Sequence, residues 1–252
     1  HAHHISGVIY FWKVIFLPCI VCKMEDRKKI AVIVAGGNGQ RMQAAVPKQF
    51  LPLGGQPVLY YSIHAFLKAF ADIKIMLVLA PDHFSYADNL LSSLGDAADI
   101  TIVAGGDTRF HSVKNGLQQV KEPAIVFVHD GARPLVSPQF IRACYQQALE
   151  SGSAVPAVEL KESIREVDKA HNKAADRTKF RVIQTPQVFR SEILLPAFEQ
   201  VYSPLFTDEA TVVESNGDQV CLITGDEKNI KITRPMDLVI AEKLLEEYIS
   251  NG

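Results

Sequence analysis

A glycine-rich segment near the start of the chain holds the residues with the clearest potential for chemistry. An apolar run over residues 30–35 is followed by three glycines and two cations: Gly36, Gly37, Gly39, Arg41 and Lys48. Glycines let backbone N–H groups approach an anion closely, and nearby cations can offset charge that builds up during transfer at phosphorus. The segment therefore predicts a site for a phosphorylated ligand. The alternative is that both cations are surface residues after an ordinary turn.

Two familiar phosphate-binding motifs do not match this segment. The dinucleotide fingerprint requires a small residue where Met42 stands, and the segment lacks the Gly-Lys-Ser/Thr ending of the P-loop. A dinucleotide cofactor or a kinase-type ATP site is therefore not the first choice. Transfer at phosphorus by an ionised group needs positioning and positive charge more than a protein nucleophile, and this fits the two cations.

A second loop repeats the arrangement of an apolar run that ends in glycines. Gly106 and Asp107 precede a helical pattern that carries Arg109 and Ser112 on its first turns. Backbone groups together with Ser112 could hold a nucleobase or a ribose. The alternative is an ordinary strand-to-helix turn in which Asp107 is the N-cap.

A third loop follows the apolar run at 124–128 and contains His129, Asp130 and Arg133. An acid and an arginine at a strand end suit a phosphosugar, or a metal held beside a phosphate. The alternative is a local salt bridge. We interpret His129 as a packed neighbour rather than a base, because this chemistry needs no protein base.

The rest of the sequence predicts a parallel sheet that brings these loops together. Continuous apolar runs are typical of strands covered on both faces, and they recur at residues 30–35, 73–79, 100–104, 124–128, 153–158, 181–184 and 219–223. Helical patterns between them begin at Pro57, at Pro138 after the cap Ser137, and after Thr233. Alternating strands and helices imply βαβ units, whose ligands bind at the carboxyl ends of the strands.

One region, at about residues 159–182, departs from this alternation. It is charged, and two short alternating pieces, 163–167 and 180–184, flank a polar tip near 171–173. This pattern predicts a hairpin arm that leaves the main body. Because an isolated hairpin is marginally stable in water, we expect it to pack on a second copy of the chain.

Composition limits the other possibilities. The 252 residues are 48% hydrophobic and 21% charged, with a formal net charge of -2. These values suit one soluble α/β domain and give no broad basic surface for nucleic acid. Cys19 and Cys22 form a CxxC without a second half at metal-site spacing, so we predict incidental thiols in a reduced, cytoplasmic protein.

The first 23 residues are unlike the rest. Their apolar stretch is interrupted by Lys13 and Pro18, is too short to span a bilayer comfortably and lacks the features of a signal peptide. We expect residues 1–23 to be an extension outside the fold and Met24 to be the natural start. We therefore predict a single domain over residues 24–252, which includes the arm.

The chain resembles the 2-C-methyl-D-erythritol 4-phosphate cytidylyltransferase family. The matching pieces run in family order from about residue 30: "VAGGNGQRM", "PKQFLPL", "AGGDTRFHSV", "VHDGARPLV", "DRTKFRVIQTPQVF", "FTDEATVVESNG" and "KNIKITRPMDL". The resemblance implies a Rossmann-like nucleotidyltransferase sheet with an arm exchanged across a homodimer. It also implies transfer of CMP from CTP to methylerythritol 4-phosphate with Mg²⁺ held mainly through the CTP phosphates.

The resemblance also implies roles for individual residues. Arg41 and Lys48 match the pair that stabilises the transition state, and Lys231 matches an active-site lysine near the phosphates. The residues that match nucleotide contacts are Ala35, Gly36, Gly37, Gly39, Gly106, Asp107 and Ser112. Those that match contacts to the second substrate are Asp130, Arg133, Ser163, Arg177, Thr185 and Thr207, some of them reaching across the dimer.

The chain departs from the family pattern in three places. Gln40 stands where many members carry a second Arg, Gly131 where Ala is common, and Ser163 where a Thr hydroxyl is expected. Two other interpretations remain: a sister family of ribitol 5-phosphate cytidylyltransferases, and a nucleotide-binding protein without catalysis.

Overall fold

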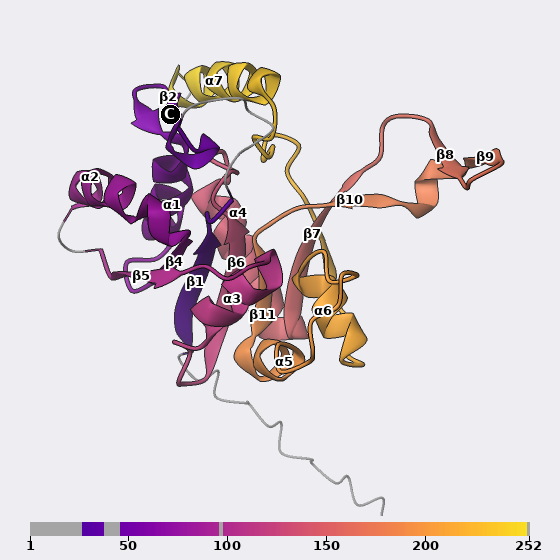
Figure 1. Ribbon diagram of the computed structural model, residues 1–252, viewed down its shortest axis with the longest axis horizontal. Helices are drawn as coiled ribbons and strands as arrows, with labels where there is room; N and C mark the ends of the chain where they lie inside the picture. Colours follow the sequence, from indigo (N-terminus) through magenta and orange to yellow (C-terminus); the bar gives the residue numbers. More distant parts are fainter. Residues whose placement is uncertain (1–26, 38–45, 96–97, 251–252) are drawn as a thin grey trace, which may run out of the picture.

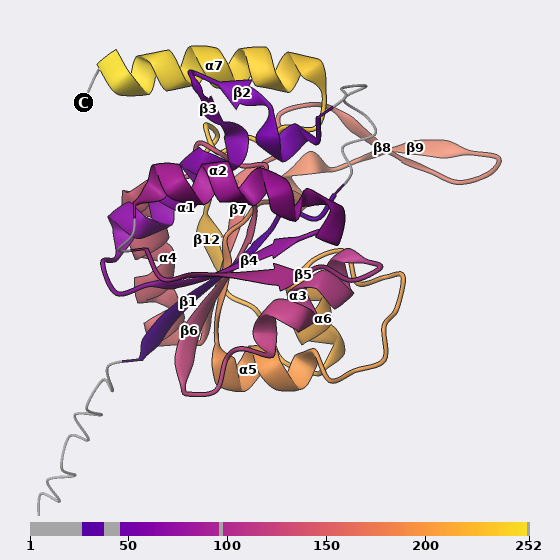
Figure 2. The same ribbon diagram turned by 60° about the vertical axis from the view of Figure 1, so that its left-hand side comes forward.

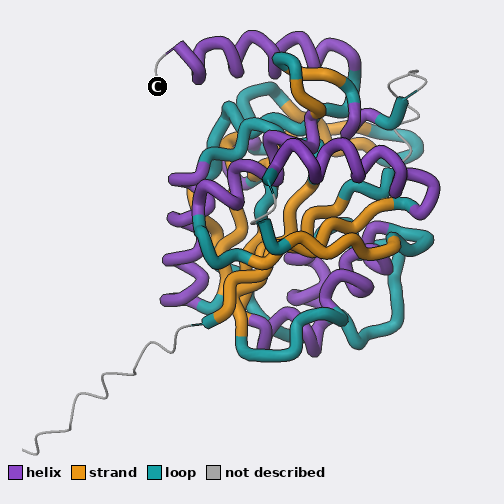
Figure 3. The backbone as a smooth tube through the Cα atoms, turned by 90° about the vertical axis from the view of Figure 1, so that its left-hand side faces the viewer, coloured by secondary structure: helices purple, strands orange, loops and turns teal. Residues whose placement is uncertain are grey.

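The computed structural model describes residues 27–37, 46–95 and 98–250. Over these residues the chain forms a central sheet with helices on both faces and an arm that projects from the main body (Figure 1). Viewed from the side, strands fill the middle of the molecule and helices flank them (Figure 3). The α/β class with a mostly parallel sheet, predicted from the alternation of apolar runs and helical patterns, is confirmed.

The main sheet has eight strands among the described residues, in the order β10-β7-β11-β6-β1-β4-β5, with β12 paired to β7. Their bounds are β1 (Lys28–Val34), β4 (Lys74–Leu79), β5 (Ile100–Ala104), β6 (Ala124–Asp130), β7 (Ser153–Glu159), β10 (Arg181–Ile183), β11 (Gln187–Arg190) and β12 (Leu222–Thr224). β6, β1, β4 and β5 run parallel, whereas β11 is antiparallel to β6 and β7. The sequence prediction did not include β11, because its four residues lack a long apolar run.

Seven α-helices in the described chain pack on or beside this sheet. They are α1 (Val58–Ala69), α2 (Phe84–Leu94), α3 (Arg109–Leu117), α4 (Pro138–Ser151), α5 (Ser191–Ala197), α6 (Glu209–Ser215) and α7 (Pro235–Ser250). The predicted start of α4 is confirmed, since Ser137 Oγ accepts the N–H of Phe140 at 3.1 Å. The described residues also form three short 3₁₀ turns, at Lys48–Phe50, Pro81–His83 and Arg177–Lys179.

The strands β1, β4, β6 and β7 are largely buried, as their continuous apolar sequences predict. The same prediction is wrong for β5, β10 and β12, which are partly exposed. One core joins a sheet face to α1, α2 and α4, and Phe66 and Phe127 pack within it edge to face. The second core joins the opposite face to α3, α5 and α6. Successive residues of a strand point to opposite faces, so a strand that serves two cores cannot alternate polar and apolar residues.

The order of the strands creates the crevice in which a ligand can bind. From β1 the chain passes outward through β4 to β5, then returns through α3 to β6 on the other side of β1. The side on which successive strands are added therefore changes at β1, although β1 and β6 themselves run parallel. Because the crossovers are right-handed, this change places α1 and α3 on opposite faces of the sheet. The carboxyl ends of strands at such a reversal are the usual binding position in this architecture.

Helix α7 covers a small separate core. It packs with the hairpin of β2 (Pro52–Leu53) and β3 (Gln56–Pro57) through apolar residues that include Leu53, Ile232 and Leu245. Figure 2 shows α7 lying along the same end of the molecule as this hairpin. The chain that leads into α7 therefore passes the carboxyl end of the sheet.

The arm differs in detail from its prediction. At its tip β8 (Ile164–Val167) pairs antiparallel with β9 (Asn172–Ala175), whereas the predicted second piece, 180–184, contributes β10, which pairs with β7 of the main sheet. The arm extends to one side of the body (Figure 1). The division into an extension at 1–23 and a single domain from residue 24 stays a prediction, because residues 1–26 lie outside the described residues.

We expect Gly116→Ala to destabilise the protein by about 1–3 kcal/mol. A Cβ at Gly116 would lie 2.6 Å from Val32 Cγ1 and 3.2 Å from Val78 Cγ2, so α3 would have to move away from β1 and β4. A glycine-to-alanine change inside a helix ordinarily stabilises a protein by about 1 kcal/mol. The sign of the change in the free energy of unfolding therefore shows whether the contact with β1 and β4 outweighs helix propensity. Chemical denaturation measures it, and an increase in the free energy of unfolding would contradict this account of the packing.

Candidate active site

A pocket of about 260 Å³ lies at the carboxyl ends of β1, β5 and β6. It is lined by all three polar loops of the sequence and by a fourth segment near the C-terminus. The lining residues include Ala35, Gly36, Gly37, Lys48, Gln49, Gly106, Asp107, Arg109, Ser112, Asp130 and Lys231. Most of the predicted nucleotide-binding residues are therefore brought to one place.

The glycine segment forms one wall of this pocket. The carbonyl of Ala35 accepts a hydrogen bond of 2.6 Å from Gln49 Nε2, and its N–H donates to the carbonyl of Val78 at 2.8 Å. These bonds fix the end of β1 while the backbone at Gly36 and Gly37 borders the pocket. Gly39 and Arg41, both predicted site residues, lie outside the described residues.

The loop before α3 forms the opposite wall. Ser112 Oγ accepts the N–H of Gly106 at 3.1 Å, so the helix holds its own entry loop. A Cβ at Gly106 would lie 2.5 Å from His111 Cβ, and no other residue fits there without a shift. The N-cap of α3 is Thr108, not Asp107, because Thr108 Oγ1 accepts the N–H of His111. The exposed Asp107 faces the pocket instead.

Asp130 is the centre of the charged part of the pocket. Lys231 Nζ lies 2.8 Å from Asp130 Oδ2, Arg109 lies 3.3 Å from Oδ1, and Arg133 Nε lies 3.8 Å from Oδ2. Burial opposes ionisation of the carboxyl, but these three cations lower the pKa of Asp130 below its ordinary value. The group is therefore a carboxylate, and it is more than the local Asp–Arg salt bridge considered as the alternative.

Arg109 also contacts a second carboxylate. Its two terminal nitrogens donate to both oxygens of Glu209 on α6, with an Nη2–Oε2 distance of 3.1 Å. Burial would lower the pKa of Arg109, yet the carboxylates of Glu209 and Asp130 raise it above its ordinary value. Burial raises the pKa of Glu209, and the charge of Arg109 opposes that rise.

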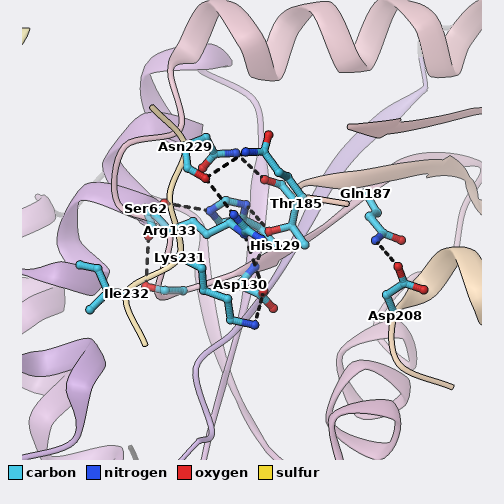
Figure 4. Close-up of polar contacts among 12 residues, drawn as sticks. Ser62, His129, Asp130, Arg133, Thr185, Gln187, Asp208, Asn229, Lys231 and Ile232 are labelled. Atoms are coloured by element: carbon cyan, nitrogen blue, oxygen red, sulfur yellow. Dashed lines mark hydrogen bonds and ion pairs between the residues drawn. The ribbon is translucent and has the colours of Figure 1, made fainter. Parts of the chain in front are cut away.

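A chain of hydrogen bonds behind the pocket holds the backbone of Asp130. The Arg133 carbonyl can only accept, so His129 Nε2 donates to it across 3.2 Å. His129 Nδ1 then accepts from the Thr185 hydroxyl at 3.2 Å, and Thr185 Oγ1 accepts the N–H of Asp130 at 3.0 Å. Figure 4 shows this cluster, with Asn229 above Thr185. His129 is a packed neighbour, as predicted.

The segment before α7 supplies the fourth side of the site. Arg133 Nη1 donates to the carbonyl of Asn229 at 2.8 Å, and the N–H of Ile232 donates to the carbonyl of Ala132 at 2.8 Å. Lys48 Nζ donates to the carbonyl of Ile232 at 2.9 Å. These contacts bring Lys231 beside Asp130 (Figure 4) and place Lys48 and Lys231, far apart in sequence, on one pocket.

The remaining predicted residues lie away from the described lining of this pocket. Arg133 and Thr185 are buried directly behind it, whereas Thr207, Ser163 and Arg177 are exposed on the surface. Arg177 donates to the carbonyl of Lys161 at the base of the arm.

Sequence reasoning gave no role to Glu209, Gln49 or Asn229, and it noted Arg109 without assigning its partners. Glu209 is part of the quoted segment "FTDEATVVESNG", so its presence was visible. Its pairing with Arg109 was not visible in the sequence, because the two residues are separated by 100 positions.

The described residues contain neither a metal-binding cluster nor a membrane-spanning helix. Within the described ranges, no three His, Cys, Asp or Glu side chains gather in a way that could hold a metal ion. No helix in that part of the chain is long and apolar enough to cross a membrane. The thiols of Cys144 and Cys221 are free, and Cys19 and Cys22 lie outside the described residues.

The fold and the pocket define a Rossmann-like α/β protein of the nucleotidyltransferase type. The chain belongs to the IspD family, the 2-C-methyl-D-erythritol 4-phosphate cytidylyltransferases, whose model matches residues 29–247. This match confirms the family inferred from the sequence motifs and does not favour the ribitol 5-phosphate sister family.

Individual relatives agree with the family match. The chain is 44% identical over 214 residues to the 2-C-methyl-D-erythritol 4-phosphate cytidylyltransferase of Phocaeicola vulgatus, which covers 85% of this chain and 98% of that protein. It is 45% identical over 221 residues to the protein of the same name from Porphyromonas gingivalis W83, with 87% and 99% coverage. Among solved structures, the 4-diphosphocytidyl-2C-methyl-D-erythritol synthase of Anaerococcus prevotii superposes with a TM-score of 0.76 at 26% identity, covering 88% of this chain and 98% of that one. The cytidylyltransferase of Francisella tularensis gives 0.70 at 33% identity, with 85% and 98% coverage.

We expect the stability of the protein to fall on acidification partly because of His129. Burial, the first cause, lowers the pKa of His129 from 6.5 to about 4. The unfolded chain takes up this proton below pH 6.5 but the folded chain does not until about pH 4, so protonation favours unfolding throughout that window. Between pH 7 and pH 4 this residue removes about 3 kcal/mol from the free energy of unfolding.

Chemical denaturation of the wild type and of His129→Gln at both pH values measures this contribution. Glutamine can still donate to the Arg133 carbonyl but does not titrate. The wild type should lose about 3 kcal/mol more than the variant over this range. Equal losses would mean that His129 is not the titrating group.

Proposed function

We propose that this protein transfers the cytidylyl group of CTP to 2-C-methyl-D-erythritol 4-phosphate. The products are 4-diphosphocytidyl-2-C-methyl-D-erythritol, a precursor in isoprenoid biosynthesis, and pyrophosphate. The observation that carries the proposal is the pocket at the carboxyl ends of β1, β5 and β6, where glycine backbone from two loops faces Lys48 and Lys231. The names of the relatives give the substrate pair.

The reaction exchanges one phosphorus–oxygen bond for another. An oxygen of the methylerythritol phosphate forms a bond to the α-phosphorus of CTP, and the bond from that phosphorus to the bridging oxygen breaks. Pyrophosphate leaves with the electron pair of that bond. An ionised phosphate needs no protein base, so the protein contributes positioning and positive charge.

The two glycine loops are suited to the nucleotide. In the proposal, backbone at Ala35, Gly36, Gly37 and Gly39 cradles the triphosphate, and Gly106, Asp107 and Ser112 hold the cytidine. Support comes from hydrogen bonds in the described parts of both loops: Gln49 holds the Ala35 carbonyl before Gly36 and Gly37, and Ser112 holds the N–H of Gly106. A rigid backbone site has little ordering entropy left to lose when the ligand binds.

The cations then act on the charge that develops during transfer. Arg41 and Lys48 stabilise the transition state, and Lys231 orients the incoming phosphate. Lys231 reaches the pocket from its ion pair with Asp130, and its side chain is 38% exposed, so the ammonium group is accessible to a ligand. Asp130 and Arg133 bind the methylerythritol moiety in this proposal.

Mg²⁺ fits this site as an ion carried mainly by the CTP phosphates. The carboxylates in the described lining are Asp107 and Asp130, and Asp130 already has three cationic neighbours. Mg²⁺ commonly takes one or two carboxylates together with substrate phosphates and water. The ion would neutralise phosphate charge, with Asp130 and Asp107 as the carboxylates within reach of the pocket.

A homodimer would explain the residues that lie away from the pocket. Ser163 and Arg177 belong to the arm, and Phe180 and Val182 at its base are half exposed. Burying these apolar side chains against a second copy would stabilise the arm and could carry Arg177 and Ser163 to the partner's site. Thr207 is assigned a substrate contact from its match to the family motif. The cytoplasmic location and the lack of nucleic-acid binding stay predictions.

The proposal is tested by pyrophosphate release from CTP and Mg²⁺, with methylerythritol 4-phosphate and ribitol 5-phosphate in parallel. We expect rapid release with the first acceptor only. Release with ribitol phosphate alone would move the protein to the sister activity. Binding of CTP without release in either reaction would indicate a nucleotide-binding protein without catalysis.

We expect Lys48→Ala to lower kcat by about a hundredfold or more, because a group that stabilises developing charge acts mainly in the transition state. The affinity for CTP, measured by calorimetry, should change far less. An equal loss in binding and turnover would mean that Lys48 only anchors the substrate.

The matched control is Lys28→Ala, at the opposite end of β1 from the pocket. It should leave both kcat and CTP binding unchanged. Because Lys48 also donates to the Ile232 carbonyl, the melting temperature of each variant is measured alongside.

A further inference from the structure

We infer that Glu209 is a positioning residue of this site: it clamps the Arg109 guanidinium so that Arg109 supports Asp130 instead of competing with the lysines for the ligand phosphates. The inference rests on the proposed function, since it concerns how the pocket divides its positive charge. Nothing in the family match assigns this role to Glu209.

The carboxylate of Glu209 is buried, which is unusual for a charged side chain. Its side chain is only 1% exposed, on the first turn of α6, and it has no contact with bulk water that could stabilise it. A carboxylate buried in this way requires a partner, because its desolvation costs several kcal/mol. Arg109 is that partner, and its side chain remains 28% exposed at the pocket.

The geometry divides the guanidinium between two carboxylates. The two terminal nitrogens of Arg109 face the two oxygens of Glu209, and the Nε side lies 3.3 Å from Asp130 Oδ1. A two-point arginine–carboxylate pair fixes the plane of the guanidinium as well as its position. Arg109 is therefore held edge-on between Glu209 and Asp130, unlike the lysines, whose ammonium groups can turn.

Glu209 is itself held by the sheet. Asp208 caps α6, and its Oδ2 accepts from Gln187 Nε2 at 3.0 Å, while Gln187 Oε1 accepts the N–H of Ala210 at 2.8 Å. Gln187 is buried at the start of β11, two residues after Thr185, which binds the backbone of Asp130. Figure 4 shows the Gln187–Asp208 contact beside the Asp130 cluster. One short stretch of chain thus fixes both carboxylates that hold Arg109.

The consequence is a difference in function between neighbouring cations. With Glu209 in place, the charge of Arg109 is balanced and all three of its nitrogens donate to Glu209 or Asp130, so the ligand phosphates are met by Lys48 and Lys231. Without the Glu209 charge, Arg109 is free to pair with phosphate in an unproductive position. We therefore expect Glu209→Gln to lower kcat about 10- to 100-fold, as misplacement of a positioned group does, without raising the KM for CTP.

A double-mutant cycle tests the inference. The variants are Glu209→Gln, Arg109→Gln and the pair together, each assayed by pyrophosphate release and by calorimetric binding of CTP. If Glu209 acts through Arg109, the double variant matches Arg109→Gln and shows no further loss. Losses that multiply, or a higher KM for CTP in Glu209→Gln with kcat unchanged, would overturn the inference.

Glu199→Gln is the matched control. Glu199 also pairs with a cation on α3, Lys114, but its side chain is 78% exposed, so this change should leave kcat and KM unchanged. If Glu209→Gln does not fold, the double variant is compared with Arg109→Gln. Because Arg109→Gln leaves the Glu209 carboxylate buried without its partner, the melting temperature of both variants is measured and their activities are compared below it. Equal activity of these two supports the inference, and lower activity of the double variant overturns it.

The assay of the wild-type protein distinguishes failure of this inference from failure of the proposed function. If wild-type protein releases no pyrophosphate with either acceptor, the proposed function fails. The cycle is then read from CTP binding alone: tighter binding in Glu209→Gln that disappears in the double variant supports the clamp, and no change in binding overturns it.

Discussion

The buried carboxylate of Asp130 is the interaction on which the rest of the site depends. A negative charge at the end of β6, beneath a pocket for phosphates, is unfavourable unless cations surround it. Arg109, Lys231 and Arg133 supply them from three separate segments. Asp130 therefore gathers three cations at the carboxyl end of β6 and holds Lys231 at the pocket.

This requirement explains several contacts that would otherwise look unrelated. The Asp130 backbone must not move, so Thr185 and the neutral imidazole of His129 fix it through buried hydrogen bonds. The cations must be within reach, so the segment before α7 is bonded to the turn after β6. Hydrogen bonds of this kind are stronger in a dry interior than in water, and an unmade one is correspondingly costly.

The sheet topology makes this arrangement possible. Because strands are added on one side of β1 as far as β5 and then on its other side from β6, two loops from opposite faces meet at one edge, and α3 brings Arg109 toward the same point. The antiparallel strand β11 then connects the floor of the pocket to α6 and so to Glu209. The paired strands of the arm, β8 and β9, take no part in these cores.

Much of this protein was determined by local pattern in its sequence. Continuous apolar runs, proline and serine at helix starts, and glycines at strand ends identified the fold, the three loops and Lys48, because periodicity and backbone freedom act over a few residues. The family motifs added Lys231 and Thr185. Only the tertiary structure decided that Thr108 rather than Asp107 caps α3, that residues 181–183 pair with β7, and that Arg109 lies between Asp130 and Glu209. The reason is physical: the partner of a buried charge is set by which strands become neighbours, and residues separated by 100 positions carry no local signal of their contact.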